Sequence, residues 1–225
     1  MLAGYRTAVF DCDGVVLDSN RVKTEAFRTA TLPYGAAAAE AMVAYHTAHG
    51  GVSRYAKFSH FLDAIVPGQA GPGLEALLAA YAAAVHDGLR ACAVAPGLAG
   101  LRAAHPGQRW LIVSGGDQAE LRALFAERDL AAMFDGGIFG SPDTKDTILA
   151  REIAAGTIGA PALFLGDSTY DHRAAATAGL DFVFVSGWSE VRNWPDYVRE
   201  NRLPVVPALA ALADPDKAAG TGGTA

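Results

Sequence analysis

The 225-residue chain is long enough for one large domain, or for one domain with an insertion, and 51% hydrophobic with 19% charged residues is typical of a globular protein. The formal net charge is −6 at pH 7 and the 18 lysines and arginines are scattered, which argues against a nucleic-acid-binding surface. No apolar run approaches the roughly 20 residues of a membrane helix, and the N-terminal residues do not resemble a signal peptide, so we expect no membrane association and a cytoplasmic location.

The first predicted element is a buried strand at residues 7–11, where an apolar run leads into Asp11, Asp13 and Gly14. Side chains at positions i and i+2 of a strand point the same way, so both carboxylates can face one ligand beyond the strand. Two adjacent anions are costly without a cation or a catalytic task. An isolated D-x-D sequence is more often a solvated acidic turn, so the rest of the chain must decide.

The chain has two cysteines, Cys12 and Cys92. They are too few for a disulfide framework and are not at the spacing of metal ligands. We expect both to be small buried hydrophobic residues. Cys12 lies between the two acids and is an alternative nucleophile, but strand alternation would turn its side chain away from them.

Residues 20–92 carry helical periodicity and no convincing strand. Two apolar stripes run along this segment: Tyr55, Phe58, Phe61, Leu62 and Ile65 form one, and Leu74, Leu77, Leu78, Tyr81 and Val85 form the other. A helical domain inserted after the first strand explains this pattern, and Pro96-Gly97 would mark the return to the sheet. His46 and His49 have helical spacing but no third ligand, so we interpret them as surface histidines rather than a zinc site.

Further strands are predicted at residues 109–114, 161–166 and 181–186, each followed by a helical pattern. Such alternation indicates an α/β fold, a doubly wound parallel sheet covered on both faces. We therefore expect an α/β core from residues 1–19 and 93–213, a helical cap domain at 20–92, and a flexible tail at 214–225. Nothing in the apolar pattern demands a partner chain, which favours a monomer or a weak dimer.

Four polar segments recur where an apolar run stops or a helix begins. They are Asp11-x-Asp13-Gly14, Ser114-Gly115-Gly116, Lys145 and Gly166-Asp167-Ser168-Thr169-Tyr170-Asp171. The carboxyl ends of neighbouring parallel strands line one crevice, so we expect these groups to meet there. Carboxylate oxygens without histidine or cysteine favour Mg²⁺ over zinc. Taken singly, Ser114 is typical of a turn, Lys145 of a solvated helix and Asp171 of a helix cap.

The order and content of these segments resemble the four motifs of the haloacid dehalogenase-like (HAD) hydrolases. The matching sequences are D-C-D-G-V-V-L-D-S, S-G-G, K and G-D-S-T-Y-D-x-x-A-A-x-x-A-G. The resemblance extends to about residue 186, and the helical insertion is similar to the cap of subfamily I. One departure is Asp146, which follows Lys145 where many relatives have proline.

The resemblance implies a role for each matching residue. Asp11 would attack phosphorus to form an aspartyl-phosphate, and Asp13 would protonate the leaving alcohol and then deprotonate water. Ser114, with Gly115 beside it, would hold a phosphoryl oxygen, and Lys145 would offset negative charge there.

The resemblance also implies a magnesium site. Asp11, the Asp13 carbonyl oxygen and Asp167 would bind Mg²⁺ directly. Asp171 would hold that shell together.

We therefore interpret the chain as a Mg²⁺-dependent phosphatase of a small phosphorylated metabolite. Asp13 separates phosphate-ester chemistry from the dehalogenating and phosphonate-cleaving relatives, which typically have other residues there. The segment G-V-S-R ending at Arg54 resembles the specificity loop of β-phosphoglucomutase-like members, so Arg54 is a candidate substrate ligand, equally well explained as an exposed helix residue. Lys57 and His60 are weaker candidates. A polar cap loop suits a sugar phosphate, and a β-phosphoglucomutase-like sugar phosphomutase is the alternative.

Overall fold

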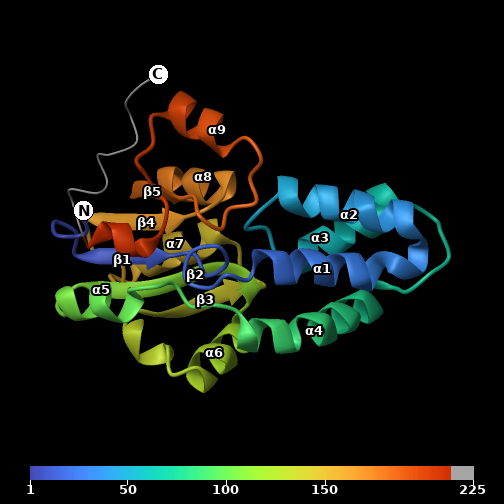
Figure 1. Ribbon diagram of the computed structural model, residues 1–225, viewed down its shortest axis with the longest axis horizontal. Coiled ribbons are helices and arrows are strands. Elements are labelled where there is room, and N and C mark those ends of the chain that lie inside the picture. Colours follow the sequence, from blue (N-terminus) through green and yellow to red (C-terminus); the bar gives the residue numbers. More distant parts are fainter. Residues whose placement is uncertain (214–225) are drawn as a thin grey trace.

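The structure is a computed structural model that describes residues 1–213, and it divides into a sheet with helices on both sides and a group of helices beyond one end of the sheet (Figure 1). The predicted tail at 214–225 lies outside the described residues. No helix in the described part of the chain is both long and apolar enough to cross a bilayer.

Parallel strands form a single sheet in the described residues, in the order β3-β2-β1-β4-β5-β6. The strands are β1 (Thr7–Phe10), β2 (Arg109–Asp117), β3 (Gly137–Ser141), β4 (Ala162–Gly166), β5 (Asp181–Val185) and β6 (Val205–Val206). β1 is central, with Val9 in register between Leu111 of β2 and Phe164 of β4. The predicted doubly wound α/β fold is confirmed, and β3 and β6 are strands that the sequence patterns did not reveal.

Helices cover both faces of this sheet, because strand alternation sends successive apolar side chains to opposite sides. Phe10 and Trp110 pack with α5 (Leu98–Ala104) and α6 (Gln118–Glu127) on one face. On the other face, Val9 and Phe164 pack with three helices: α7 (Lys145–Ala154), α8 (Thr169–Thr177) and α9 (Trp194–Asn201). The short 3₁₀ turns η3 (Ala131–Met133) and η4 (Leu209–Leu212) pack on the first face.

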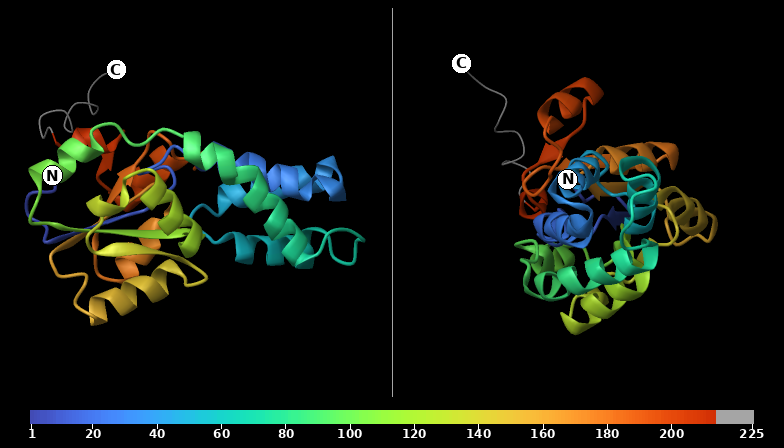
Figure 2. Two further views of the ribbon diagram at one scale, coloured as in Figure 1. Left: turned by 90° about the horizontal axis from the view of Figure 1, so that it is seen from below. Right: turned by 90° about the vertical axis from the view of Figure 1, so that its right-hand side faces the viewer.

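The remaining helices form a separate layer, which we call the cap, at the carboxyl end of the sheet (Figures 1 and 2). Its elements are α1 (Asn20–Thr31), η1 (Leu32–Tyr34), α2 (Ala36–Ala48), α3 (Arg54–His60), the π-helical turn η2 (Phe61–Ile65) and α4 (Leu74–Ala91). They share their own hydrophobic cluster, in which the rings of Phe27 and Tyr81 lie 4.5 Å apart. This separate cluster supports our proposal that the domain boundaries lie at residues 19/20 and 92/93.

Candidate active site

Acidic side chains from two neighbouring strands meet at the carboxyl end of the sheet. Asp11 directly follows β1, Asp167 directly follows β4, and Asp171 lies in the first turn of α8. All three are buried, and their carboxylate oxygens lie within 4.8 Å of one another. The fold therefore places three of the predicted metal and catalytic residues in one cluster.

Lys145 supplies the cation that this cluster needs. It is the first residue of α7, only 1% exposed, and its Nζ lies 2.9 Å from Asp11 Oδ1 while it also pairs with Asp171. The two carboxylates raise the pKa of Lys145 against the opposing effect of burial. Burial raises the pKa of Asp11 to about 7, although Lys145 acts to lower it, and burial raises the pKa of Asp167 strongly. The cluster carries more negative charge than one ammonium balances.

Asp171 also takes part in capping the N-terminus of α8. The sequence suggested that it opens this helix, whereas Ser168 is the N-cap and Asp171 is the third helical residue. Ser168 Oγ accepts a hydrogen bond from the Asp171 N–H (3.1 Å), and Asp171 Oδ2 accepts from the Ser168 N–H (3.1 Å). This reciprocal capping box fixes the carboxylate that holds Lys145.

Asp13 contacts a second cation, Lys23, which no motif in the sequence indicated. Its carboxylate accepts hydrogen bonds from Ser19 Oγ and Lys23 Nζ, each at 2.5 Å. Burial acts to raise the pKa of Asp13, but Lys23 outweighs it, so the net shift is downward. Ser19 is the N-cap of α1 and Lys23 lies four residues on, a spacing that places both on one helix face and was visible in the sequence.

The turn that follows Asp13 requires glycine at position 14. Gly14 has φ +74°, and a Cβ there would overlap the Asp167 carboxylate. That carboxylate is further held by Asn20, whose Nδ2 donates to Asp167 Oδ2 and to the Trp188 carbonyl, both at 2.8 Å. Asn20 is a second contact that no motif indicated.

Ser114 lies behind the cleft rather than on its surface. Its hydroxyl is fully buried and accepts a hydrogen bond from the Gly116 N–H at 3.0 Å, while Gly115 and Gly116 line the cleft. A Cβ on Gly115 would overlap the carbonyl oxygen of Gly51 in the cap. The glycines therefore allow the cap loop to approach the core backbone directly.

Arg54 joins the cap to the core. Its guanidinium donates to both Glu120 carboxylate oxygens on α6, at 2.8 and 2.7 Å, and the neighbouring Tyr55 hydroxyl donates to Asp117 at 2.8 Å. Arg54 also lines the cleft. Glu120 raises the pKa of Arg54 against burial, so the guanidinium stays charged.

If this contact serves to hold the cap closed, replacing either partner will have the same effect. We expect Arg54→Ala and Glu120→Ala each to lower kcat/KM about 2- to 5-fold, a modest loss because 43% of the Glu120 side chain is exposed. The double variant should lose no more than either single one. Additive losses, or a much larger loss for Arg54→Ala, would instead indicate that Arg54 contacts the substrate.

The two cap histidines differ, and the interpretation of His46 as a surface residue is wrong. His46 is 8% exposed because it packs on the Phe27 ring, whereas His49 is exposed. His46 Nδ1 lies 2.7 Å from Nζ of the buried Lys57, and both residues line the cleft. His60 stacks on Tyr45 instead, with ring centroids 3.8 Å apart.

Cys12 has no place in the cleft. It is fully buried within the hydrophobic cluster on one face of the sheet, and burial raises the pKa of its thiol. A protonated, inaccessible thiol is a poor nucleophile, so the alternative nucleophile is disfavoured.

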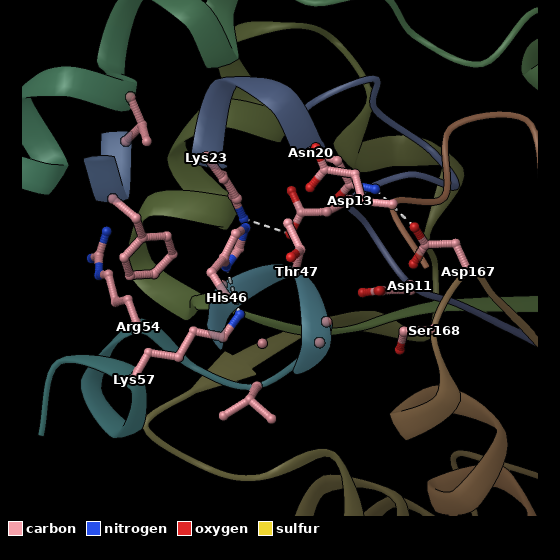
Figure 3. Close-up of a pocket in the computed structure, with 18 of the residues that line it drawn as sticks. Asp11, Asp13, Asn20, Lys23, His46, Thr47, Arg54, Lys57, Asp167 and Ser168 are labelled. Carbon is pink, nitrogen blue, oxygen red and sulfur yellow. Dashed lines mark hydrogen bonds and ion pairs between the residues drawn. The ribbon is translucent and has the colours of Figure 1, made fainter. Parts of the chain in front are cut away.

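A cleft lies between the cap and the core. Figure 3 shows its two sides: His46, Arg54 and Lys57 come from the cap, and Asp11, Asp167 and Ser168 from the core. Anionic and cationic groups thus face each other across the cleft.

Comparison with known proteins identifies the family. A model of the haloacid dehalogenase-like hydrolases matches residues 5–179. Because this match covers most of the chain, the chain belongs to that family and is an enzyme of the hydrolase class. A search of curated protein sequences finds no significant match.

Solved structures share the fold at low sequence identity. A predicted phosphatase from Clostridium acetobutylicum is 15% identical, with 95% of this chain and 98% of that chain covered and a TM-score of 0.72. A haloacid dehalogenase-like family protein from Streptococcus pneumoniae is 17% identical, with 92% and 97% covered and a TM-score of 0.66. CbbY from Rhodobacter sphaeroides in complex with phosphate is 21% identical, with 84% and 89% covered and a TM-score of 0.63.

Proposed function

We propose that this enzyme is a Mg²⁺-dependent phosphatase that hydrolyses a small phosphorylated metabolite through an aspartyl-phosphate on Asp11. The observation that carries the proposal is the buried contact of Asp11 with Lys145 beside Asp167 and Asp171. Phosphoryl transfer depends mainly on positioning and on stabilising negative charge, and this cluster supplies both. Family membership supports the same reaction class.

In the proposed reaction, a carboxylate oxygen of Asp11 attacks phosphorus and the bond from phosphorus to the leaving oxygen breaks. Asp13 must enter this step protonated, against the lowering of its pKa by Lys23, and it donates that proton to the leaving oxygen, so the product leaves as an alcohol. Asp13 then accepts a proton from the water that attacks the aspartyl-phosphate, which releases phosphate and restores Asp11. Lys145 and the backbone N–H of Gly115 offset charge on the transferring group, and the hydrogen bond from the Gly116 N–H to Ser114 holds the Gly115–Gly116 turn in place.

The donor set fits Mg²⁺, since the clustered carboxylates offer only hard oxygen ligands. Burial, together with the neighbouring carboxylates, raises the pKa of Asp11 and of Asp167, and a cation would counter both effects. Asp11, the Asp13 carbonyl oxygen and Asp167 would hold the ion, with Asp171 supporting them. When bound, Mg²⁺ would supply further positive charge next to the transferring phosphoryl group.

Chelation of divalent cations is expected to abolish turnover. We expect EDTA to remove phosphate release, and excess Mg²⁺ to restore it, because the acidic cluster needs a cation to bind an anionic substrate. Mg²⁺ without substrate should raise the Tm, which reports binding independently of activity. Hydrolysis that continues undiminished in EDTA would contradict the metal assignment.

A sugar phosphate is the substrate class we propose. The cleft is lined by side chains such as Asn20, Thr47 and Tyr81 that can form hydrogen bonds with hydroxyl groups. A mutant of CbbY, which shares this fold, has been solved in complex with xylulose-(1,5)bisphosphate. A screen of phosphate release from sugar phosphates, phosphoglycolate and nucleoside monophosphates, with Mg²⁺ present, tests the proposal. Isomerisation of a hexose 1-phosphate that needs an activating bisphosphate would favour the phosphomutase alternative.

A further inference from the structure

Lys57 is a buried cation for which the proposed reaction has no use. It is 2% exposed, and its Nζ contacts His46 Nδ1 at 2.7 Å and lies 5.5 Å from the Phe27 ring centroid. Among the three lysines in the described residues, Lys23 and Lys145 pair with carboxylates and Lys57 does not. A buried charge is costly unless it is paired.

The other cations on the cap side of the cleft are already neutralised. Lys23 pairs with Asp13, and Arg54 pairs with Glu120. Glu190, an anion that also lines the cleft, accepts a hydrogen bond from Thr24 at 2.8 Å and forms no ion pair with Lys57. Burial and Lys23 lower the pKa of Lys57 to about 7 against the opposing effect of Asp13 and Glu190, neither of which forms an ion pair with it. A bound anion would supply the missing partner.

The hydrogen-bonding groups of Lys57 and His46 also indicate that their ligand is a hydrogen-bond acceptor. Burial lowers the pKa of His46 to about 2, so its ring is neutral, and because Nδ1 accepts from Lys57 the remaining proton is on Nε2. The ammonium and the Nε2–H then offer donors only. Figure 3 shows this pair facing the cleft from the side opposite Asp11 and Asp167.

We propose that Lys57 and His46 form a subsite for a second anionic group of the substrate, a carboxylate or a phosphate, at the end remote from the phosphoryl group transferred to Asp11. This inference rests on the proposed function and narrows its substrate class to doubly anionic metabolites. It assigns to Lys57 the role of recognising the leaving group, and to His46 that of holding the lysine in position.

The test compares substrates that differ only in the second anion. One pair is 3-phosphoglycerate and glycerol 3-phosphate, for a carboxylate, and the other is fructose 1,6-bisphosphate and fructose 6-phosphate, for a phosphate. The wild-type enzyme should prefer the doubly anionic member of at least one pair, and that pair identifies the anion. Lys57→Met should lower its kcat/KM about 10- to 100-fold, mainly through KM, with a several-fold smaller loss on its partner. Arg21→Met, which removes an exposed cap cation outside the cleft, is the control for overall charge.

A second measurement separates recognition from a structural role. Because Met fills most of the space of the lysine stem and removes an unpaired buried charge, Lys57→Met should raise the Tm of the ligand-free protein. A lower Tm together with equal losses on both members of each pair would overturn the inference, as would wild-type preference for the singly anionic members. If no substrate releases phosphate, the proposed function fails, and calorimetric titration of the same compounds into wild type and Lys57→Met decides the subsite independently.

Discussion

Asp11→Asn is expected to reduce turnover by about 10⁴-fold or more, because the amide cannot attack phosphorus to form the acyl-phosphate. The measurement is phosphate release under saturating Mg²⁺ and substrate. Wild-type enzyme quenched in acid during turnover should yield a phosphorylated peptide containing Asp11, and the variant should not.

We expect the variant to fold as the wild type does. Burial raises the pKa of the Asp11 carboxyl to about 7, so its charged form is unfavourable in the folded protein, and the neutral amide removes that cost. Its Tm is therefore expected to be no lower than that of the wild type. Asp63→Asn, an exposed carboxylate of the cap, serves as the matched control and should retain full activity. Activity of Asp11→Asn within tenfold of the wild type would refute the nucleophile assignment.

Lys145→Met is expected to damage both stability and activity. The ammonium is 1% exposed and contacts Asp11 and Asp171, so its loss leaves two buried carboxylates without their cation. Breaking a buried ion pair in this way typically costs about 3–5 kcal/mol of unfolding free energy. We expect a loss of this size in urea unfolding, with kcat lowered about 10²- to 10³-fold at temperatures where the variant is folded.

Arg151→Met is the control on the same helix. Its ion pairs with Asp143 and Glu152 are formed by an arginine whose side chain is 45% exposed, so its removal should cost no more than about 1 kcal/mol. Equal destabilisation by the two substitutions would show that the buried cluster has no special dependence on Lys145.

Much of the fold follows from local patterns that neighbouring residues establish by themselves. The apolar run before Asp11 is β1, Asp117 caps α6 by accepting from the Glu120 N–H, and Lys145 begins α7. Parallel strands present their carboxyl ends at one edge of the sheet. The positions of the motifs at those ends were therefore enough to predict that Asp11, Asp167 and Asp171 lie together.

What the sequence did not reveal depends on contacts between distant segments. β6 is two residues long, and β3 contains two glycines among its five residues, so neither has a periodicity to detect. The Lys57–His46 pair joins two cap helices, and both side chains pack against Phe27. It could not be predicted because it depends on how the cap helices pack on one another. The partner of Arg54 lies 66 residues away on the core, so a motif could indicate the arginine but not Glu120.

The close approach of Gly51 to Gly115 has a consequence for how ligands come and go. A Cβ on Gly51 would likewise come within 3.2 Å of Ser168 and Tyr170 and within 3.5 Å of Lys145 Nζ, so the backbone of the cap loop lies close to these core side chains. Rotation of one side chain cannot release a contact that the backbone makes, so we expect the whole 49–52 loop to move when the cap separates from the core. We expect such a backbone displacement before the substrate binds and again before the products leave, and the speed of the second would then limit product release.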